Sequence, residues 1–378
     1  MRVVHLSDFH LDKNNQNRSK DLVYFLCQSL VEVNTEKTID LIVFTGDAIN
    51  KGGQSFASVK LGLQEFEKTF VDPICESIGL SKERFVFTIG NHDINREADS
   101  PYAEEGLKTR LVTKEELDFF WYDKNSARDM NRVNEFKEFE RDFYSKYHSI
   151  NNYESTRFQT NIKVRIGDTL IGITCLNSAW RCYDSKEDQG RILIGERQIS
   201  DSLRYIDDCD IKIAISHHHF SWVRNFEMVN LERLLTTNYS MYFCGHTHSP
   251  GASCYIKPEG VTFVFVAPGI LSANINENSN QYKNGFGVID YDDIQGRIDS
   301  RIFLQQNVKS FNLYKDFGTN GIWSNDIPVG EEAQRKKELQ EVISNIKEQA
   351  ESLNEHLLSY HTKTTAPKSL KEMFVMPT

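Results

Sequence analysis

Seven residues that can bind a metal ion follow short apolar stretches of this sequence. These stretches run into "DFH", "TGD", "GNHD", "SHHH" and "GHTH", and the candidate ligands are Asp8, His10, Asp47, Asn91, His217, His246 and His248. All of them offer oxygen or imidazole nitrogen, which suits Mn, Fe, Zn or Ni better than copper(I) or an iron–sulfur cluster. Seven ligands are too many for one tetrahedral ion but suit two ions that share a bridging carboxylate, as in two-metal phosphoryl-transfer sites.

Each of these patterns has a plainer explanation when it stands alone. "GD" after an apolar run is common, Asp-x-His at a strand end is weak evidence, and "GNHD" and "GHTH" are more specific. The three consecutive histidines, His217, His218 and His219, are compatible alone with a metal site, a catalytic base or a polar turn. The five patterns together, in this order and each after an apolar run, favour one shared metal centre.

The apolar runs predict the elements that position these residues. "VVHL", "DLIVF", "RFVFTI", "IKIAI" and "MYFC" are short, rich in β-branched and aromatic residues and bounded by polar residues, which is typical of buried strands. Layered α/β folds place their sites at the carboxyl ends of such strands. "SKDLVYFLCQSLVEVNTE" has helical spacing, and residues 113–148 predict a helical pair with a packed stripe or an insertion over the site. Residues 262–304 return to strands, so we expect a β-sandwich flanked by helices.

The carboxyl-terminal part of the chain has a different pattern. Seven residues at alternating spacings of four and three form a heptad seam, namely Leu339, Ile343, Ile346, Ala350, Leu353, Leu357 and Tyr360. About three repeats are close to the minimum for a coiled coil, and a helix docked on the catalytic domain is the other interpretation. The last residues end in the middle of an apolar pattern, which suggests a piece of a longer protein.

Composition restricts the class of protein. The 378 residues are 39% hydrophobic and 26% charged, as in globular proteins, and no apolar run approaches the length of a membrane span. The amino terminus enters a strand-like segment directly and the seven cysteines form no C-x-x-C pair, so we expect a cytoplasmic protein without a disulfide framework. A net charge of −10 argues against coating of nucleic acid by bulk electrostatics, although a metal centre can still attract phosphate.

The motifs "DFH", "GDAINKG", "GNHD", the histidine after "IKIAIS" and "GHTH" resemble the five ordered motifs of the calcineurin-like metallophosphoesterase superfamily. The resemblance covers roughly residues 1–305 and implies an α/β fold, a four-layer α/β/β/α sandwich with a helical insertion at about 98–150. Residues 306–378 would then form a linker and an amphipathic helix that leads to a further module. The resemblance also implies a binuclear centre.

By the same resemblance, each candidate has an expected place in that centre. Asp8, His10 and His248 would bind the first metal, and Asp47 would bridge. The second metal would be bound by Asn91, His217 and His246. The family commonly reads "HHPLSW" where this chain has "HHHFSW", so the ligand aligns with His217, and His219 stands where proline is expected. His218 is the alternative ligand; otherwise His218 and His219 would line the substrate cleft, where His218 would contact substrate, or would face water.

Three further residues have expected roles in catalysis. Two cations would acidify a water that bridges them, and the resulting hydroxide would attack a phosphate in line with its leaving group. His92 is suited to protonate the leaving oxygen, with Asp93 orienting it, although His92 could instead be structural and Asp93 a capping residue. Arg181 of "SAWR" is a candidate phosphate contact, because a guanidinium can bind two oxygens, and a surface role is the alternative.

The substrate and partners are less constrained by the sequence. Since "GDAINKGG" and "GNHD" differ from the "GDxVDRG" and "GNHE" of the protein-phosphatase branch, we expect a phosphodiester substrate, either a nucleotide or nucleic acid. The alternatives are a nuclease effector module of a larger, truncated protein and a non-catalytic binding module that retains the fold. No membrane partner is expected, and the carboxyl-terminal helix predicts self-association.

Overall fold

Two seven-stranded sheets carry the predicted ligands. The computed structural model describes residues 1–123, 130–149, 151–183, 187–271, 284–293, 295–307, 309–327 and 342–351. The chain divides into two compact units, one of residues 1–291 and 298–325 and the other of residues 292–297 and 326–378. The first unit holds the residues that could do chemistry, and the following paragraphs concern that unit unless they state otherwise.

The first sheet contains the amino-terminal strands. Its order is β13, β12, β11, β1, β2, β3, with β14 paired to β12. The bounds are β1 Arg2–Leu6, β2 Leu41–Phe44, β3 Phe85–Phe87, β11 Gly285–Asp292, β12 Arg297–Asn307, β13 Ser310–Leu313 and β14 Ile322–Asp326. β1, β2 and β3 are parallel, and β11 is antiparallel to β1. The carboxyl ends of β1, β2 and β3 therefore lie along one edge of the sheet.

The second sheet has the order β4, β5, β6, β7, β8, β10, β9. Its bounds are β4 Tyr153–Ser155, β5 Thr160–Ile166, β6 Thr169–Cys175, β7 Ile211–Ile215, β8 Met241–Cys244, β9 Gly251–Lys257 and β10 Gly260–Val266. β6, β7, β8 and β10 are parallel, so the segments after β7 and β8 leave the sheet at the same edge. Strands β7 and β8 are almost fully buried, as expected for parallel strands with both faces covered.

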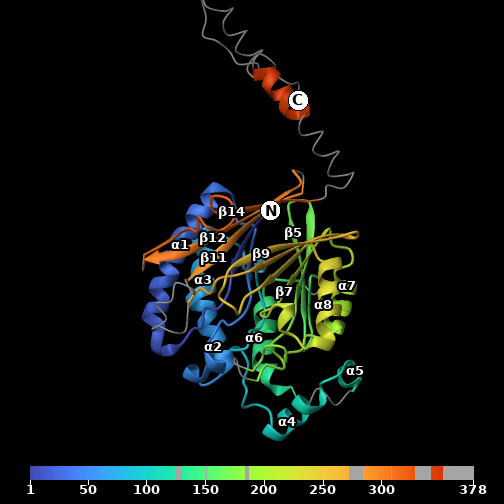
Figure 1. The fold of residues 1–378 in the computed structure, drawn as a ribbon. Helices are drawn as coiled ribbons and strands as arrows, with labels where there is room; N and C mark the ends of the chain where they lie inside the picture. Colours follow the sequence, from blue (N-terminus) through green and yellow to red (C-terminus); the bar gives the residue numbers. More distant parts are fainter. Residues whose placement is uncertain are drawn as a thin grey trace, which may run out of the picture. The chain divides into compact units, whose positions relative to one another are not determined.

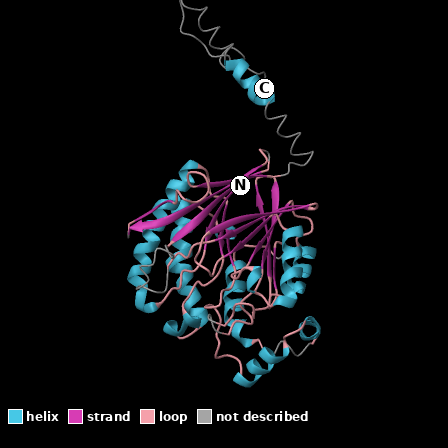
Figure 2. Ribbon diagram, in the orientation of Figure 1, coloured by secondary structure: helices cyan, strands magenta, loops and turns pink. Residues whose placement is uncertain are grey.

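Helices cover the outer face of each sheet (Figures 1 and 2). α1 Gln16–Glu36, α2 Val59–Phe66 and α3 Asp72–Ile78 lie on the side of the first sheet, and α7 Glu196–Tyr205 and α8 Asn225–Asn238 lie on the side of the second. The buried apolar residues of α1 recur every three or four positions, as expected for one face of a helix packed on a sheet, and they are Leu22, Val23, Leu26, Leu30 and Val33. This arrangement confirms the predicted α/β/β/α sandwich.

The two sheets contact each other through their inner faces. The ring of His5 on β1 meets the ring of Phe243 on β8 edge-on, with centroids 5.0 Å apart. The hydroxyl of Thr88, just after β3, donates to the carbonyl of Leu176, just after β6, at 3.0 Å. Each fully buried aromatic side chain contributes roughly 1.5–3 kcal/mol through burial of apolar surface. Packing between the sheets thus fixes the edges that carry the predicted ligands.

The segment expected as a helical insertion divides into two parts. α6 Asn134–Tyr144 packs Phe136, Phe139 and Phe143 against Phe87 of β3, so it belongs to the core. α4 Pro101–Arg110 has no buried residue, and α5 Lys114–Tyr122 buries only Leu117 and Phe120. Figure 1 shows α4 and α5 apart from the sheets, beyond the edge where the strands end. The packed stripe expected over residues 113–148 therefore lies mostly on α6.

The first sheet continues beyond residue 305, where the catalytic domain was expected to end. β13 pairs with β12 from Phe303 to Asn307, and β14 pairs with β12 as well. In the second unit, residues 342–351 are helical, with Val342, Ile343 and Ile346 exposed. Of the predicted heptad seam, Leu339, Leu353, Leu357 and Tyr360 lie outside the described residues. Within the described part of the chain, no helix is both long and apolar enough to span a bilayer.

Candidate metal centre

The carboxyl ends of five parallel strands bring the seven predicted ligands together. Asp8 and His10 follow β1, Asp47 follows β2 and Asn91 follows β3, while His217 follows β7 and His246 and His248 follow β8. The first sheet thus supplies both carboxylates, one imidazole and an amide, and the second sheet supplies three imidazoles. The two edges meet where the sheets face each other, so residues up to 240 positions apart become neighbours.

Asp47 lies between two sets of donor atoms. Its Oδ2 is 3.8 Å from Nε2 of His10 and 3.3 Å from Nε2 of His217. On one side, Oδ1 of Asp8 is 3.7 Å from Nε2 of His10 and 3.1 Å from Nε2 of His248. One carboxylate within reach of both sets is the geometry that a bridging ligand requires.

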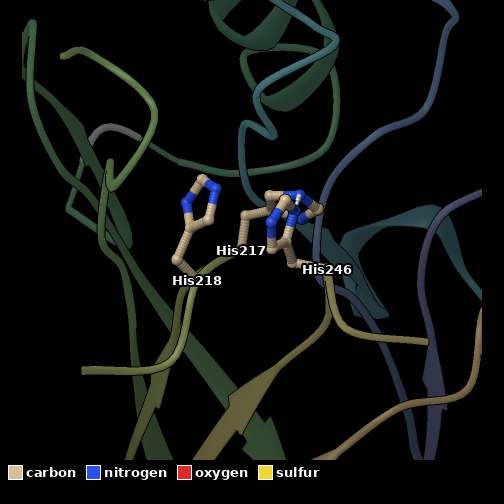
Figure 3. A group of neighbouring side chains, drawn as sticks. All are labelled: His217, His218 and His246. Carbon is tan, nitrogen blue, oxygen red and sulfur yellow. Dashed lines mark hydrogen bonds between the residues drawn. The ribbon is translucent and has the colours of Figure 1, made fainter. Parts of the chain in front are cut away.

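On the other side of Asp47 the donors are an amide and two imidazoles. Nε2 of His217 is 2.9 Å from Oδ1 of Asn91 and 3.1 Å from Nδ1 of His246. Figure 3 shows the rings of His217 and His246 close together, with His218 beside them. Nδ1 of His217 is 2.8 Å from the carbonyl oxygen of Thr45, which fixes the proton on Nδ1 and leaves the Nε2 lone pair for a metal.

The backbone is strained at five of the seven residues. Left-handed φ angles occur at Asp8 (57°), His10 (48°), Asp47 (57°), His246 (67°) and His248 (54°). Such angles in residues other than glycine cost roughly 1–3 kcal/mol each and cluster at functional sites. The strain turns these side chains from the strand ends toward a common point.

Glycines beside the predicted ligands allow the loops to approach each other. A Cβ on Gly90 would lie 2.2 Å from Oδ1 of Asp47, and a Cβ on Gly46 would lie 2.9 Å from Nδ1 of His217. Gly46 also has a φ of +98°. The "GD" and "GN" pairs of the sequence therefore have a physical reason, because only glycine allows these loops to pack so closely.

The charges of the cluster fit bound cations. Asp8 and Asp47 are buried, and within the described ranges no lysine or arginine forms an ion pair with either carboxylate. Burial alone would raise the pKa of Asp47, but the surrounding imidazoles, His217 foremost, hold it well below the usual value. For His217, burial lowers the pKa, and the carboxylate of Asp47 outweighs it and raises the pKa to about 9. Buried carboxylates need paired charge or coordinated metal, and the imidazoles around these two anions suit divalent ions, which would bind in place of the extra imidazole protons.

The three consecutive histidines face three different environments. Only His217 points to Asp47 and Asn91. His218 is fully buried, with Nδ1 2.9 Å from the Ser178 hydroxyl and Nε2 3.8 Å from the Cys182 thiol. A nitrogen of His218 nevertheless lies within 4.8 Å of ligand atoms of His217 and His246. Because His218 has no solvent exposure and binds protein groups, it does not line an open cleft as expected.

The third histidine of the run has a local structural role. Nδ1 of His219 accepts a hydrogen bond from the backbone N–H of Ser221 at 3.2 Å and caps the short helical turn Phe220–Trp222. This turn leads the chain from β7 toward α8. His219 therefore replaces the proline expected at this position with a side chain that stabilises the same turn.

His92 stands beside the cluster with one nitrogen held by the protein. Its Nδ1 is 3.1 Å from Oδ1 of Asn50 and 3.2 Å from the backbone nitrogen of Lys51. A proton on Nδ1 can be donated to Asn50, and a bare Nδ1 can accept from the Lys51 N–H, so both protonation states have a partner. The ring centroid of His92 lies 4.7 Å from that of His10. A ring nitrogen of His92 also lies within 4.8 Å of ligand atoms of His10 and Asp47, so the ring reaches the donor cluster.

Asp93 does not orient His92 as the sequence suggested. Its Oδ2 accepts from the backbone N–H groups of Asp47 and Gly90, both at 2.8 Å, and its Oδ1 accepts from Ile49 at 3.0 Å. Burial foremost, and then the charge of Asp47, raise the pKa of Asp93 to about 7. The carboxylate ties the loops after β2 and β3 together, which is the capping role considered as the alternative, and the ring of His92 instead contacts Asn50.

Arg181 also lies away from the position expected for a phosphate contact. Its guanidinium is fully buried and donates to both carboxylate oxygens of Glu104, at 3.1 and 3.0 Å, and to the hydroxyl of Tyr183. Arg132 forms a second ion pair with the same carboxylate. Buried cations need such partners, so Arg181 anchors α4 to the loop after β6 instead of facing the cluster.

Sequence reasoning missed two kinds of residue that support the cluster. Asn50 and Lys51 contact His92, and their only sequence signal is their place in "GDAINKG", directly after Asp47. Thr45 supports His217 through a backbone carbonyl, which no side-chain pattern can reveal. Residues that act through the main chain are visible only in the folded structure.

One protein family matches the part of the chain that carries strands of both sheets and the donor cluster. Residues 1–250 match the family "Calcineurin-like phosphoesterase", and the chain belongs to this family. The family implies a centre of two metal ions, and the residues assembled here offer the carboxylates and imidazoles for it.

Two curated relatives and two solved structures are similar to the chain. A probable cyclic nucleotide phosphodiesterase of Xenorhabdus bovienii is 28% identical over 32% of this chain and 46% of its own length. An uncharacterised metallophosphoesterase-like protein of Bacillus subtilis is 23% identical over 66% of this chain and 49% of its own length. The chain thus spans about half the length of these relatives.

Among the solved structures, a dimetal phosphatase from Danio rerio aligns with a TM-score of 0.41 and 9% identity, over 83% of this chain and 98% of the other. The NAD nucleotidase of Haemophilus influenzae aligns with a TM-score of 0.39 and 12% identity, over 91% of this chain and 56% of the other.

Proposed function

We propose that this protein hydrolyses phosphodiester bonds at the cluster around Asp47. The observation that carries the proposal is the position of that carboxylate, with Oδ2 within 4 Å of imidazoles from both donor sets. We assign Asp8, His10 and His248 to one cation, Asn91, His217 and His246 to the other, and Asp47 to both. When bound, two cations supply a clamp on the phosphate oxygens and lower the pKa of a water between them.

The residues of the chain have separate tasks in this proposal. His92 donates a proton from Nε2 to the leaving oxygen, while Asn50 and Lys51 hold its Nδ1 side. Asp93 keeps the loops of Asp47 and Asn91 in register through three backbone hydrogen bonds. A general acid placed beside the donor cluster supports cleavage of esters whose leaving group is a poor one.

A diester substrate is favoured over a monoester by similarity. The relative from Xenorhabdus bovienii is described as a probable cyclic nucleotide phosphodiesterase. A nucleotide or nucleic-acid diester is therefore the proposed substrate, with Mn the metal expected to support turnover in vitro and Fe, Zn and Ni the other candidates.

The test compares a diester with a monoester. Bis-p-nitrophenyl phosphate and p-nitrophenyl phosphate are incubated with the chelator-treated protein after addition of Mn, Fe, Zn or Ni. We expect turnover of the diester to return with at least one metal and to exceed that of the monoester. The Asp47→Ala variant, treated identically, is the control for contaminating phosphatase. Absence of turnover with all four metals overturns the proposal.

We also propose that the carboxyl-terminal helix mediates self-association. Residues 342–351 are helical and expose Ile343 and Ile346 of the predicted seam, together with the neighbouring Val342. Sedimentation of the wild type and of an Ile343→Asp, Ile346→Asp variant tests this, since charged residues on a seam disrupt helix pairing. A wild type that sediments as a monomer at high concentration contradicts the proposal.

A further inference from the structure

A cavity of about 500 Å³ opens beside His92. Asn91 and His92 line it together with Lys51, Arg96 and Glu97. This volume lies within the range of 300–1,000 Å³ that is typical of small-molecule sites. The cavity begins at the side chain proposed to protonate the leaving oxygen, so it lies where the leaving group departs.

Two cationic side chains line this cavity. Among the ion pairs of the described residues, none includes Lys51 or Arg96, although acidic residues outnumber basic ones by 54 to 44 in the chain. The guanidinium of Arg96 instead donates through Nη2 to the backbone carbonyl of Asn91 at 3.3 Å. Glu97 contributes one opposing charge at the rim, and its side chain is exposed.

The position of Arg96 separates its role from that of Arg181. Arg181 is fully buried and binds Glu104, whereas Arg96 is exposed at the cavity and bound to a single carbonyl. A guanidinium has five N–H donors in a planar fork, so Arg96 retains donors that fit two oxygens of a phosphate. Lys51 adds a compact positive charge, and its backbone is fixed against His92.

We infer that this cavity binds a leaving group that carries a phosphate of its own. The inference rests on the proposed phosphodiesterase function and narrows its substrate to linear diesters with a second phosphate on the leaving side. A cyclic mononucleotide has one phosphate, and its leaving oxygen stays tethered to the product, so it leaves Lys51 and Arg96 without a ligand. A terminally phosphorylated dinucleotide or a nucleic-acid strand supplies that ligand.

The reaction conserves its atoms and protons. A bond forms between phosphorus and the oxygen of water, while the bond from phosphorus to the leaving oxygen breaks. His92 gives a proton to the leaving oxygen and regains one when the attacking water loses its proton. The products are a phosphate monoester and an alcohol that bears the second phosphate, which Lys51 and Arg96 hold until release.

The test uses three dinucleotides that differ only in a terminal phosphate. They are TpT, pTpT with a 5′-phosphate and TpTp with a 3′-phosphate, each assayed with the metal-loaded protein. We expect kcat/KM for one phosphorylated isomer to exceed that for TpT by about tenfold or more, the effect of one charged hydrogen bond. A longer single strand shows which substrate supplies the second phosphate. If its kcat/KM equals that of the preferred dinucleotide, the cavity binds a nucleotide-sized leaving group. If its kcat/KM is higher, the substrate is nucleic acid.

Variants assign the preference to the two cations. Arg96→Gln and Lys51→Gln should each reduce the preference for the phosphorylated isomer, while Arg165→Gln should retain it. Arg165 is a matched control because it is exposed on β5 and pairs with Leu170 at the amino end of β6, the opposite edge of the sheet. A preference that survives in both cavity variants, or equal kcat/KM for TpT and both isomers, overturns the inference.

Failure of the proposed function has a different signature. If the wild type hydrolyses no diester, including bis-p-nitrophenyl phosphate, the phosphodiesterase proposal fails. The cavity is then tested by calorimetry with thymidine 3′,5′-bisphosphate. Binding weakened about tenfold by Arg96→Gln supports an anion site, and equal binding by wild type and variant overturns it.

Discussion

Two loops of consecutive polar residues meet at the cluster of candidate metal ligands, and their residues have different roles. In the loop after β3, Asn91 faces the cluster, His92 lines the adjoining cavity and Asp93 binds backbone amides of two loops. In the loop after β7, only His217 points to Asp47 and Asn91. His218 and His219 bind to the fold instead.

The difference follows from the partners that each loop meets. The β3 loop lies against the β2 loop, whose backbone amides and Asn50 provide partners directly beside the cluster. The β7 loop lies against the segment after β6, where Ser178 and Cys182 receive His218. A polar residue next to a metal ligand can therefore act on substrate only where the surrounding protein leaves one of its polar atoms exposed to the site. His92 meets this condition because it lines the cavity, whereas His218 and His219 bind protein groups.

The largest expected effect is that of Asp47→Ala, which removes the one side chain common to both donor sets. Turnover should fall to the detection limit, and the metal content measured by elemental analysis should fall more than in any other single ligand variant. The reason is that both cations lose a ligand and are less shielded from each other. Two retained metals with near-wild-type turnover contradict the bridging assignment. His248→Ala is the matched control, because it removes a donor from one set only.

His92→Ala sharpens the role of the β3 loop. The variant should keep both metals and lose roughly 10²–10⁴ in turnover of a natural diester, the usual contribution of a general acid. With bis-p-nitrophenyl phosphate the loss should be smaller, because p-nitrophenolate departs without a proton. Equal losses on the two substrates exclude a leaving-group role. Asn50→Ala should show the same substrate dependence with a smaller loss, since Asn50 positions the ring of His92.

His217→Ala and His218→Ala test the β7 loop directly. His217→Ala should lower the metal content. Nε2 of His217 lies 3.3 Å from Oδ2 of Asp47 in the loop after β2 and 2.9 Å from Oδ1 of Asn91 in the loop after β3. His218→Ala should keep the metal content and lose about 1–3 kcal/mol of unfolding free energy, because the Ser178 hydroxyl loses its hydrogen bond to the buried imidazole and keeps only the one from the backbone N–H of residue 218. If only His218→Ala loses metal, His218 and not His217 is the metal ligand. His219→Ala, which removes only a turn cap, is the control.

Much of the fold and of the cluster could be predicted from the sequence. Short apolar runs that end in polar motifs fixed the strands, and parallel order at one edge brings Asp8, Asp47 and Asn91 together. The α/β/β/α arrangement and the family followed from those motifs and were confirmed. These features are local, because strand periodicity and strand-end chemistry are written in adjacent residues.

The features that could not be predicted depend on partners far away in the sequence. Arg181 was expected at phosphate, but Glu104, 77 residues earlier, receives its guanidinium. Asp93 was expected beside the ring of His92, but the amide of Asp47 lies closer to its carboxylate. The catalytic domain was expected to span residues 1–305, and the first sheet continues past that residue because β14 pairs with β12. Which partner a buried polar group reaches is decided by packing of the whole chain.

Glu227 resembles Asp93 because its buried carboxylate also accepts hydrogen bonds from backbone N–H groups, and it lies outside the donor cluster. Glu227 on α8 is buried, and its Oε1 accepts hydrogen bonds from the backbone N–H groups of Ile194 and Gly195 in the turn before α7. Its Oε2 has no hydrogen-bond partner among the described residues. Burial raises the pKa of Glu227 to about 7, and the two backbone hydrogen bonds oppose that rise. Both carboxylates hold turns through amides, but Glu227 does so without ligands nearby.

The smallest expected effect is therefore a pH dependence of stability that originates at Glu227. A folded-state pKa of about 7, above the unfolded value of 4.5, means that the folded chain binds this proton more tightly. Its stabilising contribution is complete below about pH 4.5 and is lost as the pH rises through about 7, by roughly 3 kcal/mol. Glu227→Gln should remove that part of the slope in urea unfolding between pH 5 and 8, whereas Glu232→Gln, at a half-buried position on the same helix, should keep it. If the pH slope of stability is the same in Glu227→Gln and in the wild type, the Glu227 carboxylate is ionised over this whole pH range. Two backbone hydrogen bonds would then be enough to stabilise a buried negative charge.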